Sequence, residues 1–233
     1  MVAPASPASP RLESNLDRLY MQRFPEAERR RRAALWRALC DSFFSRYIPP
    51  GATVVDLGAG YCDFINSVRA ARRVAVDLNP DTARAAAPGV EVCAVDLEHL
   101  DQAIAQGAVD VAFASNVFEH MRSPDHLLSV LRAVARVLCP GGRLIVLQPN
   151  VRIVGGAFWD FFDHTLPLTE RGMTEAIEVA GLRVVECRAR FLPYTTKSRL
   201  PQWPLLVRFY LALPPAQWLL GKQMLVVAER PCD

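Results

Sequence analysis

The sequence predicts an α/β fold, in which a doubly wound sheet carries helices on both faces, and three observations indicate it. The short run Thr53–Leu57 is apolar and β-branched, as in a strand that is covered on both faces. Gly58 and Gly60 follow this run, and glycines there allow a sharp turn and a close approach to a ligand. Further apolar runs then alternate with helical patterns, which is typical of strands joined by helices.

The other elements follow from their hydrophobic patterns. Residues 11–47 are expected to be helical, with a short helix over 12–20 and a long amphipathic helix that ends before Pro49. We expect further helices over 63–70, 125–138 and 165–181, the last opening near Thr169, and a short apolar helix between Pro204 and Pro214. We expect strands over 73–77, 90–95, 109–114, 143–148, 183–190 and 223–228.

The length, charge and composition of the chain limit the classes of protein to which it can belong. A chain of 233 residues with a net charge of +3 suits one domain with a full core. We find no basic patch with interleaved aromatic residues, so nucleic acid is not an expected partner. The six cysteines form no C-x-x-C pair, which favours reduced thiols and a cytoplasmic location. Residues 1–10 have the composition of a disordered tail, and neither a signal peptide nor a membrane span is predicted.

The glycine turn is of a kind that usually binds a nucleotide, and two acidic residues indicate which one. The dinucleotide fingerprint G-x-G-x-x-G needs a third glycine where this chain has Asp63. A carboxylate in the first turn of the following helix would also repel a pyrophosphate. Asp77 lies 21 residues after Asp56, at the tip of the second strand, where a carboxylate accepts both ribose hydroxyls. The turn therefore predicts a nucleoside that is less phosphorylated than a dinucleotide.

A set of motifs resembles, in order and spacing, those of class I S-adenosylmethionine-dependent methyltransferases. The motifs are Val54 to Gly60, Val76-Asp77, Asp96-Leu97, Ser115 to His120 and Leu138 to Gly142. The resemblance covers residues 48–148, and the rest of the chain looks like a bacterial small-molecule branch of the family. It implies a Rossmann-like, mixed seven-stranded sheet whose last strand is antiparallel, with S-adenosyl-L-methionine as the cofactor. Cys62 stands where the family pattern D-x-G-x-G-x-G has its third glycine, and we expect this small residue to be tolerated.

The resemblance also assigns roles in binding the cofactor. In such proteins the glycine turn lies along the methionine part, the acid after the second strand holds the ribose, and the acid after the third strand meets the adenine amine. These roles fall to Gly58 to Gly60, to Asp77, and to Asp96 with Leu97. The full expected set is Asp56, Gly58, Ala59, Gly60, Asp77, Leu78, Asp96, Leu97, Ser115 and Asn116.

The expected domain organisation follows from these assignments. Residues 11–233 are predicted to form a single methyltransferase domain after the tail. Within it we expect an N-terminal helical lid over 11–48, a cofactor-binding core over 49–150, and a substrate-side half over 151–233 with an apolar insertion at 197–222.

Three residues are candidates for the chemistry. Asp163 and His164 follow the fifth strand, and a neutral imidazole near pH 7 is the usual general base for a hydroxyl. The alternative is a structural Asp-His pair at the boundary of an element. Glu119-His120 is similar to the end of the E-x-x-E-H metal ligands of ubiquinone-biosynthesis O-methyltransferases, but Asn116 replaces the first glutamate. We therefore predict His164, Asp163 and His120 as catalytic candidates and no metal.

The predicted function is methyl transfer to a small molecule, most simply to a hydroxyl on a glycan, a lipid-linked compound or a secondary metabolite. The sulfonium of the cofactor already carries an activated methyl group, so positioning of the reactants should dominate catalysis. Two alternatives belong to other classes. One is a non-catalytic partner protein that binds S-adenosylmethionine, and the other is a nicotinamide-dependent oxidoreductase, which the missing third glycine disfavours.

Residues 197–222 are expected to cover the acceptor pocket. The apolar residues Leu205, Leu206, Phe209, Tyr210 and Leu213 recur near helical spacing and predict one strongly apolar helix face. We expect this face to pack on the N-terminal helix or on the mate in a homodimer. Peripheral contact with a membrane surface is the alternative, because Trp203, Tyr210 and Trp218 stand beside Arg199, Arg208 and Lys222.

Overall fold

The structure, a computed structural model, describes residues 26–194 and 204–232. The predicted tail over 1–10 and the predicted helix over 12–20 lie outside the described residues. So do Lys197, Arg199 and Trp203 of the predicted insertion.

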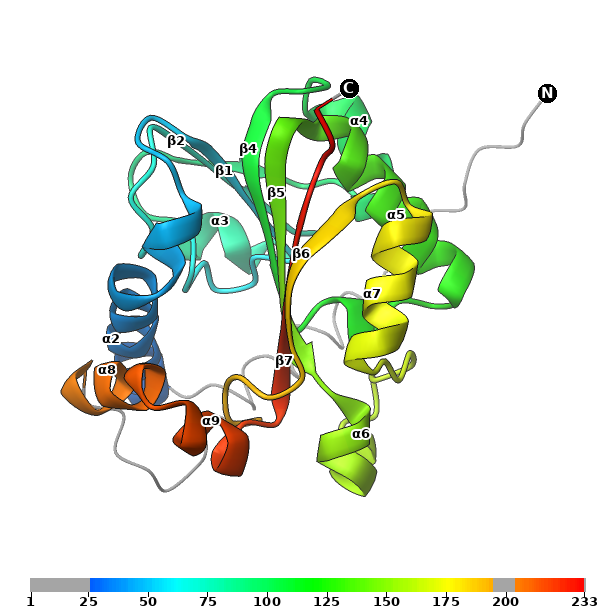
Figure 1. Cartoon of the computed structure of the whole chain (residues 1–233). Coiled ribbons are helices and arrows are strands. Elements are labelled where there is room, and N and C mark those ends of the chain that lie inside the picture. Colours follow the sequence, from blue (N-terminus) through cyan, green and yellow to red (C-terminus); the bar gives the residue numbers. More distant parts are fainter. Residues whose placement is uncertain (1–25, 195–203, 233) are drawn as a thin grey trace.

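A seven-stranded sheet forms the centre of the molecule (Figure 1). Its strands lie in the order β3-β2-β1-β4-β5-β7-β6. Strands β1 to β5 pair in parallel, and β7 pairs antiparallel with both β5 and β6. The mixed, doubly wound sheet with an antiparallel last strand is confirmed, and β7 lies inside the sheet although it ends the chain. The strands are β1 (Thr53–Leu57), β2 (Arg72–Val76), β3 (Val90–Cys93), β4 (Val109–Ser115), β5 (Leu138–Pro149), β6 (Arg183–Arg188) and β7 (Gln223–Glu229).

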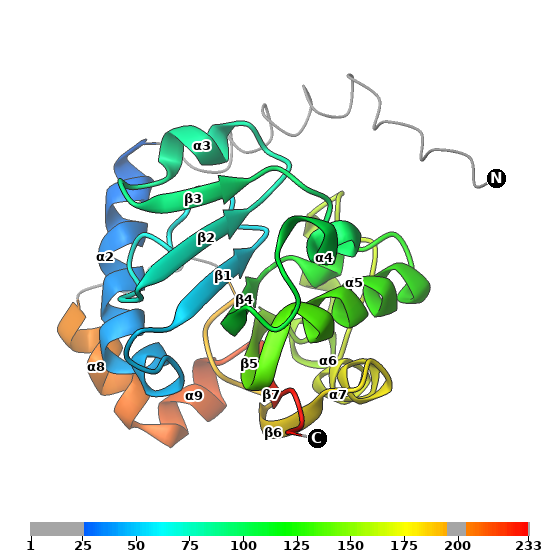
Figure 2. The ribbon, with the colours of Figure 1, turned by 90° about the horizontal axis from the view of Figure 1, so that it is seen from above.

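Helices cover both faces of this sheet (Figure 2). They are α2 (Glu26–Ser42), α3 (Asp81–Ala85), α4 (Leu100–Ala103), α5 (Pro124–Val137), α6 (Val151–Val154), α7 (Glu170–Val179), α8 (Pro204–Ala212) and α9 (Pro214–Leu220). Short 3-10 helices span Phe44–Tyr47, Leu97–His99, Phe118–His120 and Gly155–Asp160. Helix α7 begins where predicted, because the Thr169 side chain caps it by accepting a hydrogen bond from the Gly172 N–H.

Alternate residues of the central strands enter two separate hydrophobic cores. In β4, Val111 and Phe113 pack on the side of α2, whereas Ala112 and Ala114 pack on the side of α5. Successive side chains of a strand point to opposite faces, so a strand covered on both sides is apolar at most positions. This requirement explains the uninterrupted apolar runs in the sequence.

The helix predicted over 63–70 is wrong. Residues 60–67 form successive turns instead. Cys62, just before the predicted range, has a positive φ of 60°, so a right-handed helix cannot run through it. Asp63 lies in one of these turns and not in a helix, and its carboxylate pairs with Arg32 of α2 at 2.7 Å. The predicted repulsion between Asp63 and a pyrophosphate loses its structural basis.

Helix α2 packs on the sheet through Trp36, Leu39 and Cys40, which are all buried. The N-terminal helix is thus present as expected, while its role as a lid stays a prediction. Helix α8 forms between Pro204 and Pro214, as predicted, and lies beside α2 (Figure 1). Among the described residues, no helix is both long and apolar enough to cross a membrane.

Candidate functional site

The predicted cofactor residues meet at one edge of the sheet. Strands β3, β2, β1 and β4 are neighbours and run in parallel, so their carboxyl ends lie side by side. The chain leaves β1 toward β2 and returns to β4 on the other side of β1, which makes the gap between β1 and β4 the switch point of the topology. Ligands of doubly wound sheets bind in the crevice at such a point.

The glycine turn after β1 has the backbone geometry that the motif predicts. Gly58 and Gly60 have φ values of 64° and 49°, in the left-handed region that favours glycine. A Cβ built on Gly58 would lie 2.6 Å from Cγ2 of Val117. Position 58 therefore has no room for a side chain, and the turn is held close to the segment after β4.

Asp77 ties the tip of β2 to this turn. Its Oδ2 accepts a hydrogen bond from the Gly60 N–H at 2.6 Å, and its Oδ1 accepts one from the Asn79 N–H at 2.8 Å. Burial raises the pKa of Asp77, and these backbone N–H groups act against the rise. A carboxylate has about four acceptor positions, and the Leu78 N–H also bonds to Asp77, so about one position is left for a further donor such as a hydroxyl.

Asp56 and Cys62 lie beneath the turn. Asp56 is only 4% exposed, and burial raises its pKa well above the ordinary value, although the Ile65 N–H donates to it. Cys62 has the left-handed φ that explains why the family pattern has glycine at this position, and it is fully buried. Asp56 thus lies under the glycine turn and supports it. Ala59 lies within the turn.

The remaining predicted residues line the same edge. Asp96 follows β3, and its Oδ1 accepts a hydrogen bond from the Glu98 N–H at 3.2 Å. Asn116, directly after Ser115 at the end of β4, has a φ of 54° and is exposed. Its side-chain oxygen accepts a hydrogen bond from Gln223 Nε2 at 2.8 Å. Leu78, next to Asp77, exposes 59% of its surface and offers an apolar face at the edge.

Comparison with known proteins identifies the fold and the reaction class. Residues 55–146 match the family described as a methyltransferase domain, and this stretch holds the glycine turn, Asp77 and the Glu119-His120 motif. This match and the fold support a class I S-adenosylmethionine-dependent methyltransferase. Its cofactor is S-adenosyl-L-methionine. No curated protein sequence matches the methyltransferase at a significant level.

Solved structures share the fold of the methyltransferase at low sequence identity. A SAM-dependent methyltransferase from Archaeoglobus fulgidus is 15% identical with a TM-score of 0.65, and the match covers 92% of this chain and 99% of that one. One from Mesorhizobium loti is 20% identical with a TM-score of 0.59, covering 83% and 98%. A chain from the complex of the Trm112 methyltransferase activator with a Haloferax volcanii methyltransferase is 19% identical with a TM-score of 0.60, covering 96% and 95%.

The candidate catalytic residues gather beside the cofactor edge. Nδ1 of His120 lies 2.9 Å from the backbone oxygen of Asp163 and 3.5 Å from its carboxylate Oδ2. His164 packs against His120, with ring centroids 5.1 Å apart, and its Nδ1 lies 2.9 Å from the backbone oxygen of Phe158. The structure thus brings all three predicted residues together, and it sets the Asp163 carboxylate against His120.

Glu119 is the member of this cluster that the sequence did not single out for the chemistry. It is 1% exposed, and neither carboxylate oxygen has a hydrogen-bond partner among the described residues. Burial raises the pKa of Glu119 to about 7, with His120 acting against the rise and Asp163 adding to it. A glutamate before His120 was visible in the sequence, but its burial was not.

We expect Glu119→Gln to remove a pH dependence of stability. The folded state holds the Glu119 proton more tightly than the unfolded state, whose pKa is near 4.5. The free energy of unfolding therefore falls as the pH rises from 4.5 to about 7. Glutamine copies the neutral acid, so the variant should equal the wild type below this window and exceed it by up to about 3 kcal/mol above it.

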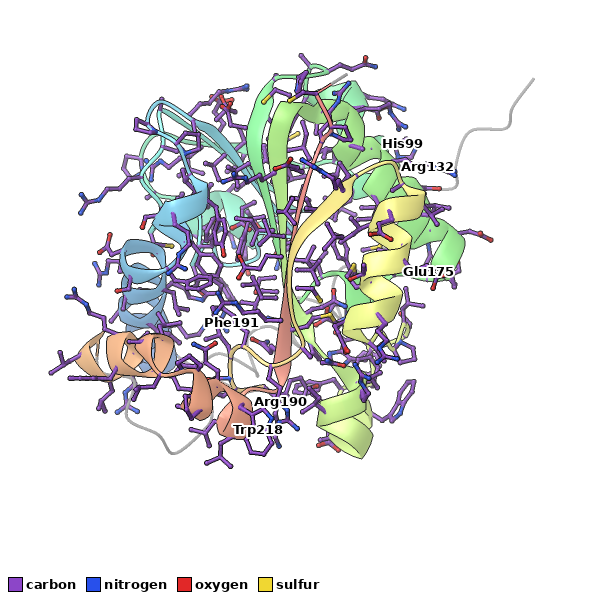
Figure 3. The ribbon with its side chains drawn as sticks, viewed as in Figure 1. His99, Arg132, Glu175, Arg190, Phe191 and Trp218 are labelled. Carbon is purple, nitrogen blue, oxygen red and sulfur yellow. The ribbon has the colours of Figure 1, made fainter. Side chains whose placement is uncertain are left out.

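Urea unfolding at pH 4.5 and pH 8 measures this difference. Glu175→Gln is the matched control, because Glu175 is an exposed glutamate on α7 (Figure 3). The control should leave the pH dependence of the wild type unchanged. Equal stability differences for Glu119→Gln at both pH values would contradict the prediction.

Two groups in the described part of the chain have donor atoms that suit a metal ion. Glu119, His120 and His164 offer ligand atoms within 4.8 Å of one another, and so do Asp96, Glu98 and His126. Imidazole and carboxylate are ligands that divalent metals accept. The expectation that the methyltransferase uses no metal stays a prediction.

Sequence reasoning also missed residues that hold the edge together. Thr82 of α3 is fully buried, and its hydroxyl donates to the backbone oxygen of Gly60 at 2.8 Å. Gln223 orients Asn116 from the start of β7. Neither residue belongs to a motif, and the contacts join segments that are distant in the chain, so no local signal could have revealed them.

Proposed function

We propose that the methyltransferase transfers a methyl group to a hydroxyl of a small molecule, with His120 as the general base. The pairing of His120 with Asp163, beside the end of β4, is the observation that carries this proposal. A backbone oxygen can only accept, so Nδ1 of His120 donates to it and Nε2 keeps the lone pair that a base needs. The His120 side chain is 31% exposed, which leaves it within reach of an acceptor.

Two other residues then act through His120. The Asp163 carboxylate near Nδ1 stabilises the imidazolium that forms when His120 takes the hydroxyl proton. His164, which is 8% exposed and stacked on Phe161, supports the ring of His120 from the buried side. The sequence favours His164 as the base, whereas the exposure of His120 and its contact with Asp163 favour His120.

The residues at the edge fit the cofactor. We propose that Gly58, Ala59 and Gly60 lie along its methionine part, with Asp56 supporting their turn from beneath. Asp77 would hold the ribose, Leu78 and Leu97 would cover the adenine, and Asp96 would accept from its amine. Ser115 and Asn116 would close the site from β4. When bound, S-adenosyl-L-methionine supplies an activated methyl group, so the chain mainly has to orient the acceptor and remove its proton.

The acceptor class is a further part of this proposal. We propose a hydroxyl on a glycan, a lipid-linked compound or a secondary metabolite, handled in the cytoplasm. Mass spectrometry of cell extracts incubated with enzyme and cofactor tests this. The expected result is a product heavier than its parent by one CH2 unit, whose fragments place the methyl group on oxygen. A methylated nitrogen or carbon would overturn the proposed acceptor, and the His120→Ala variant serves as the control for enzyme-dependent transfer.

Asp77→Ala is expected to weaken S-adenosylmethionine binding by about 2 to 3 kcal/mol, because it removes charge-assisted hydrogen bonds at a buried site. This corresponds to a Kd that is roughly 30- to 150-fold higher. The variant also frees the Gly60 N–H, which Asp77 holds at 2.6 Å. Isothermal titration calorimetry gives the affinity, with Asp41→Ala, an exposed aspartate of α2, as the control. Unchanged affinity in a folded Asp77→Ala variant would remove Asp77 from the site.

A further inference from the structure

Helices α8 and α9 expose an unusual amount of apolar surface. Of the thirteen large hydrophobic residues that are exposed in the described part of the chain, seven belong to α8, α9 and the residue between them. We call these seven the α8–α9 surface: Leu205, Leu206, Phe209, Leu213, Trp218, Leu219 and Leu220. Apolar patches of this kind mark sites of interaction with another protein or with a membrane.

Helix α8 uses only one of its two apolar faces for packing. Val207 and Leu211, one turn apart, pack into the core on the side of α2. Phe209 and Leu213, also one turn apart, are 58% and 52% exposed. Of the two expected partners of this face, the N-terminal helix does not bury Phe209 and Leu213, because α2 contacts the opposite face of α8. The homodimer mate stays a prediction. None of the described residues buries this face.

Helix α9 buries a polar side chain and exposes apolar ones, which is the reverse of the usual arrangement in a surface helix. Gln217 is 5% exposed, and its amide donates to the backbone oxygen of Leu211 at 3.0 Å. The next two residues, Trp218 and Leu219, are 71% and 69% exposed. A helix that faced only water would place its glutamine outside and its tryptophan inside. This reversal indicates an apolar environment on the outer side of α9.

The segment of the sequence that contains α8 and α9 carries charge of one sign only. No aspartate or glutamate lies between Glu186 and Glu229, while that stretch has six arginines and lysines. Among them, Arg208 and Lys222 are exposed, and the Arg190 guanidinium lies 6.0 Å from the ring centre of Trp218 (Figure 3). A second copy docked through α8 and α9 alone would bring these cations together with no acid from these two helices. Anionic lipid headgroups complement them, and each cation near such a surface adds about 1 kcal/mol of attraction.

The surface also lies next to the cofactor edge. The Lys222 backbone oxygen accepts from the Asn150 N–H at 3.0 Å, and Gln223 bonds to Asn116. The end of α9 is thus joined to the carboxyl ends of β4 and β5. A membrane on the α8–α9 surface would therefore face the side on which an acceptor enters.

We propose that the α8–α9 surface binds the headgroup region of an anionic membrane, with its apolar side chains inserted and Arg190, Arg208 and Lys222 at the level of the phosphates. Aromatic residues with arginine or lysine beside them are the mix that settles at this depth. Binding to lipid does not depend on methyl transfer, so its failure and the failure of the proposed function are separate results.

Sedimentation with sucrose-loaded vesicles tests the proposal on the full chain. The wild type should pellet with vesicles that contain phosphatidylglycerol and phosphatidylcholine, and much less with phosphatidylcholine alone. Phe209→Ser/Trp218→Ser and Arg208→Glu should each lower the partition coefficient about tenfold, which is about 1.4 kcal/mol. Added salt should weaken wild-type binding, because it screens the cations.

Val179→Ser/Val185→Ser is the matched control, since these residues are 59% and 47% exposed on α7 and β6, away from the surface. The control should pellet like the wild type, and all variants should bind S-adenosylmethionine with wild-type affinity. Failure of the wild type to pellet with anionic vesicles would overturn the proposal. So would light scattering that finds a wild-type dimer and a monomeric Phe209→Ser/Trp218→Ser variant, because a second copy would then cover this surface.

Discussion

Gly58→Val should raise the Kd for S-adenosylmethionine on the order of a thousandfold, because backbone strain and steric overlap with Val117 both arise at this position. The φ of 64° costs a branched residue about 1 to 2 kcal/mol, because its Cβ approaches the carbonyl oxygen. The new Cβ would also lie 2.6 Å from Cγ2 of Val117, so the turn must move away from the end of β4. A displaced turn no longer presents its backbone to the cofactor.

A matched variant distinguishes the effect of backbone strain on stability from an effect on cofactor binding. Gly107 has a similar φ of 68°, but a Cβ there meets nothing within 4 Å. Gly107→Val should therefore lower the melting temperature and leave the affinity for the cofactor unchanged. Gly58→Ala, a smaller change, should fall between the wild type and Gly58→Val. Calorimetry on folded protein gives the affinities, and near wild-type binding by Gly58→Val would contradict the proposed position of the turn.

The second large effect is expected at the histidines. His120→Ala should lower kcat about 10²-fold or more, as loss of a general base does, without changing the affinity for S-adenosylmethionine. His164→Ala should have a smaller effect on kcat but should lower the melting temperature, because His164 is buried against Phe158 and Phe161. Asp163→Asn keeps the backbone oxygen that Nδ1 of His120 contacts and removes only the negative charge.

The assay uses the acceptor identified by mass spectrometry, and it measures kcat for each variant. A larger loss for His164→Ala than for His120→Ala would make His164 the base. Turnover within twofold of the wild type for both variants would mean that no histidine of this cluster acts as a base.

Much of the fold was visible in the sequence because its causes are local. A strand covered on both sides is mostly apolar, as β1 is apart from Asp56, and glycines at 58 and 60 favour positive φ, so β1 and its turn were predictable. The ends of parallel strands must meet at one edge, which is why Asp77 and Asp96 could be placed together from their positions in the chain. The family match to residues 55–146 covers this predictable part.

Other features were decided by contacts between distant segments. The stretch after the glycine turn looks helical, yet Cys62 adopts a left-handed φ there and Asn66 bonds to Ala85 and Ala87, which holds the segment in turns. The neighbours Asp163 and His164 suggested a pair, but the Asp163 carboxylate lies against His120, from another part of the chain. Residues that are neighbours in the sequence need not have side chains in contact, because loops from distant parts of the chain can lie side by side.

The sequence by itself determined the sheet, the glycine turn and the acid at the tip of β2, because backbone conformation and alternate burial leave local patterns. Only the tertiary structure decided which apolar face of α8 is buried. Val207 and Phe209 are equally apolar in the sequence, but Val207 is 9% exposed and Phe209 is 58% exposed. The physical reason is that hydrophobic spacing predicts a helix with an apolar face, while the position of α2 determines whether that face packs inside the chain or remains for a partner.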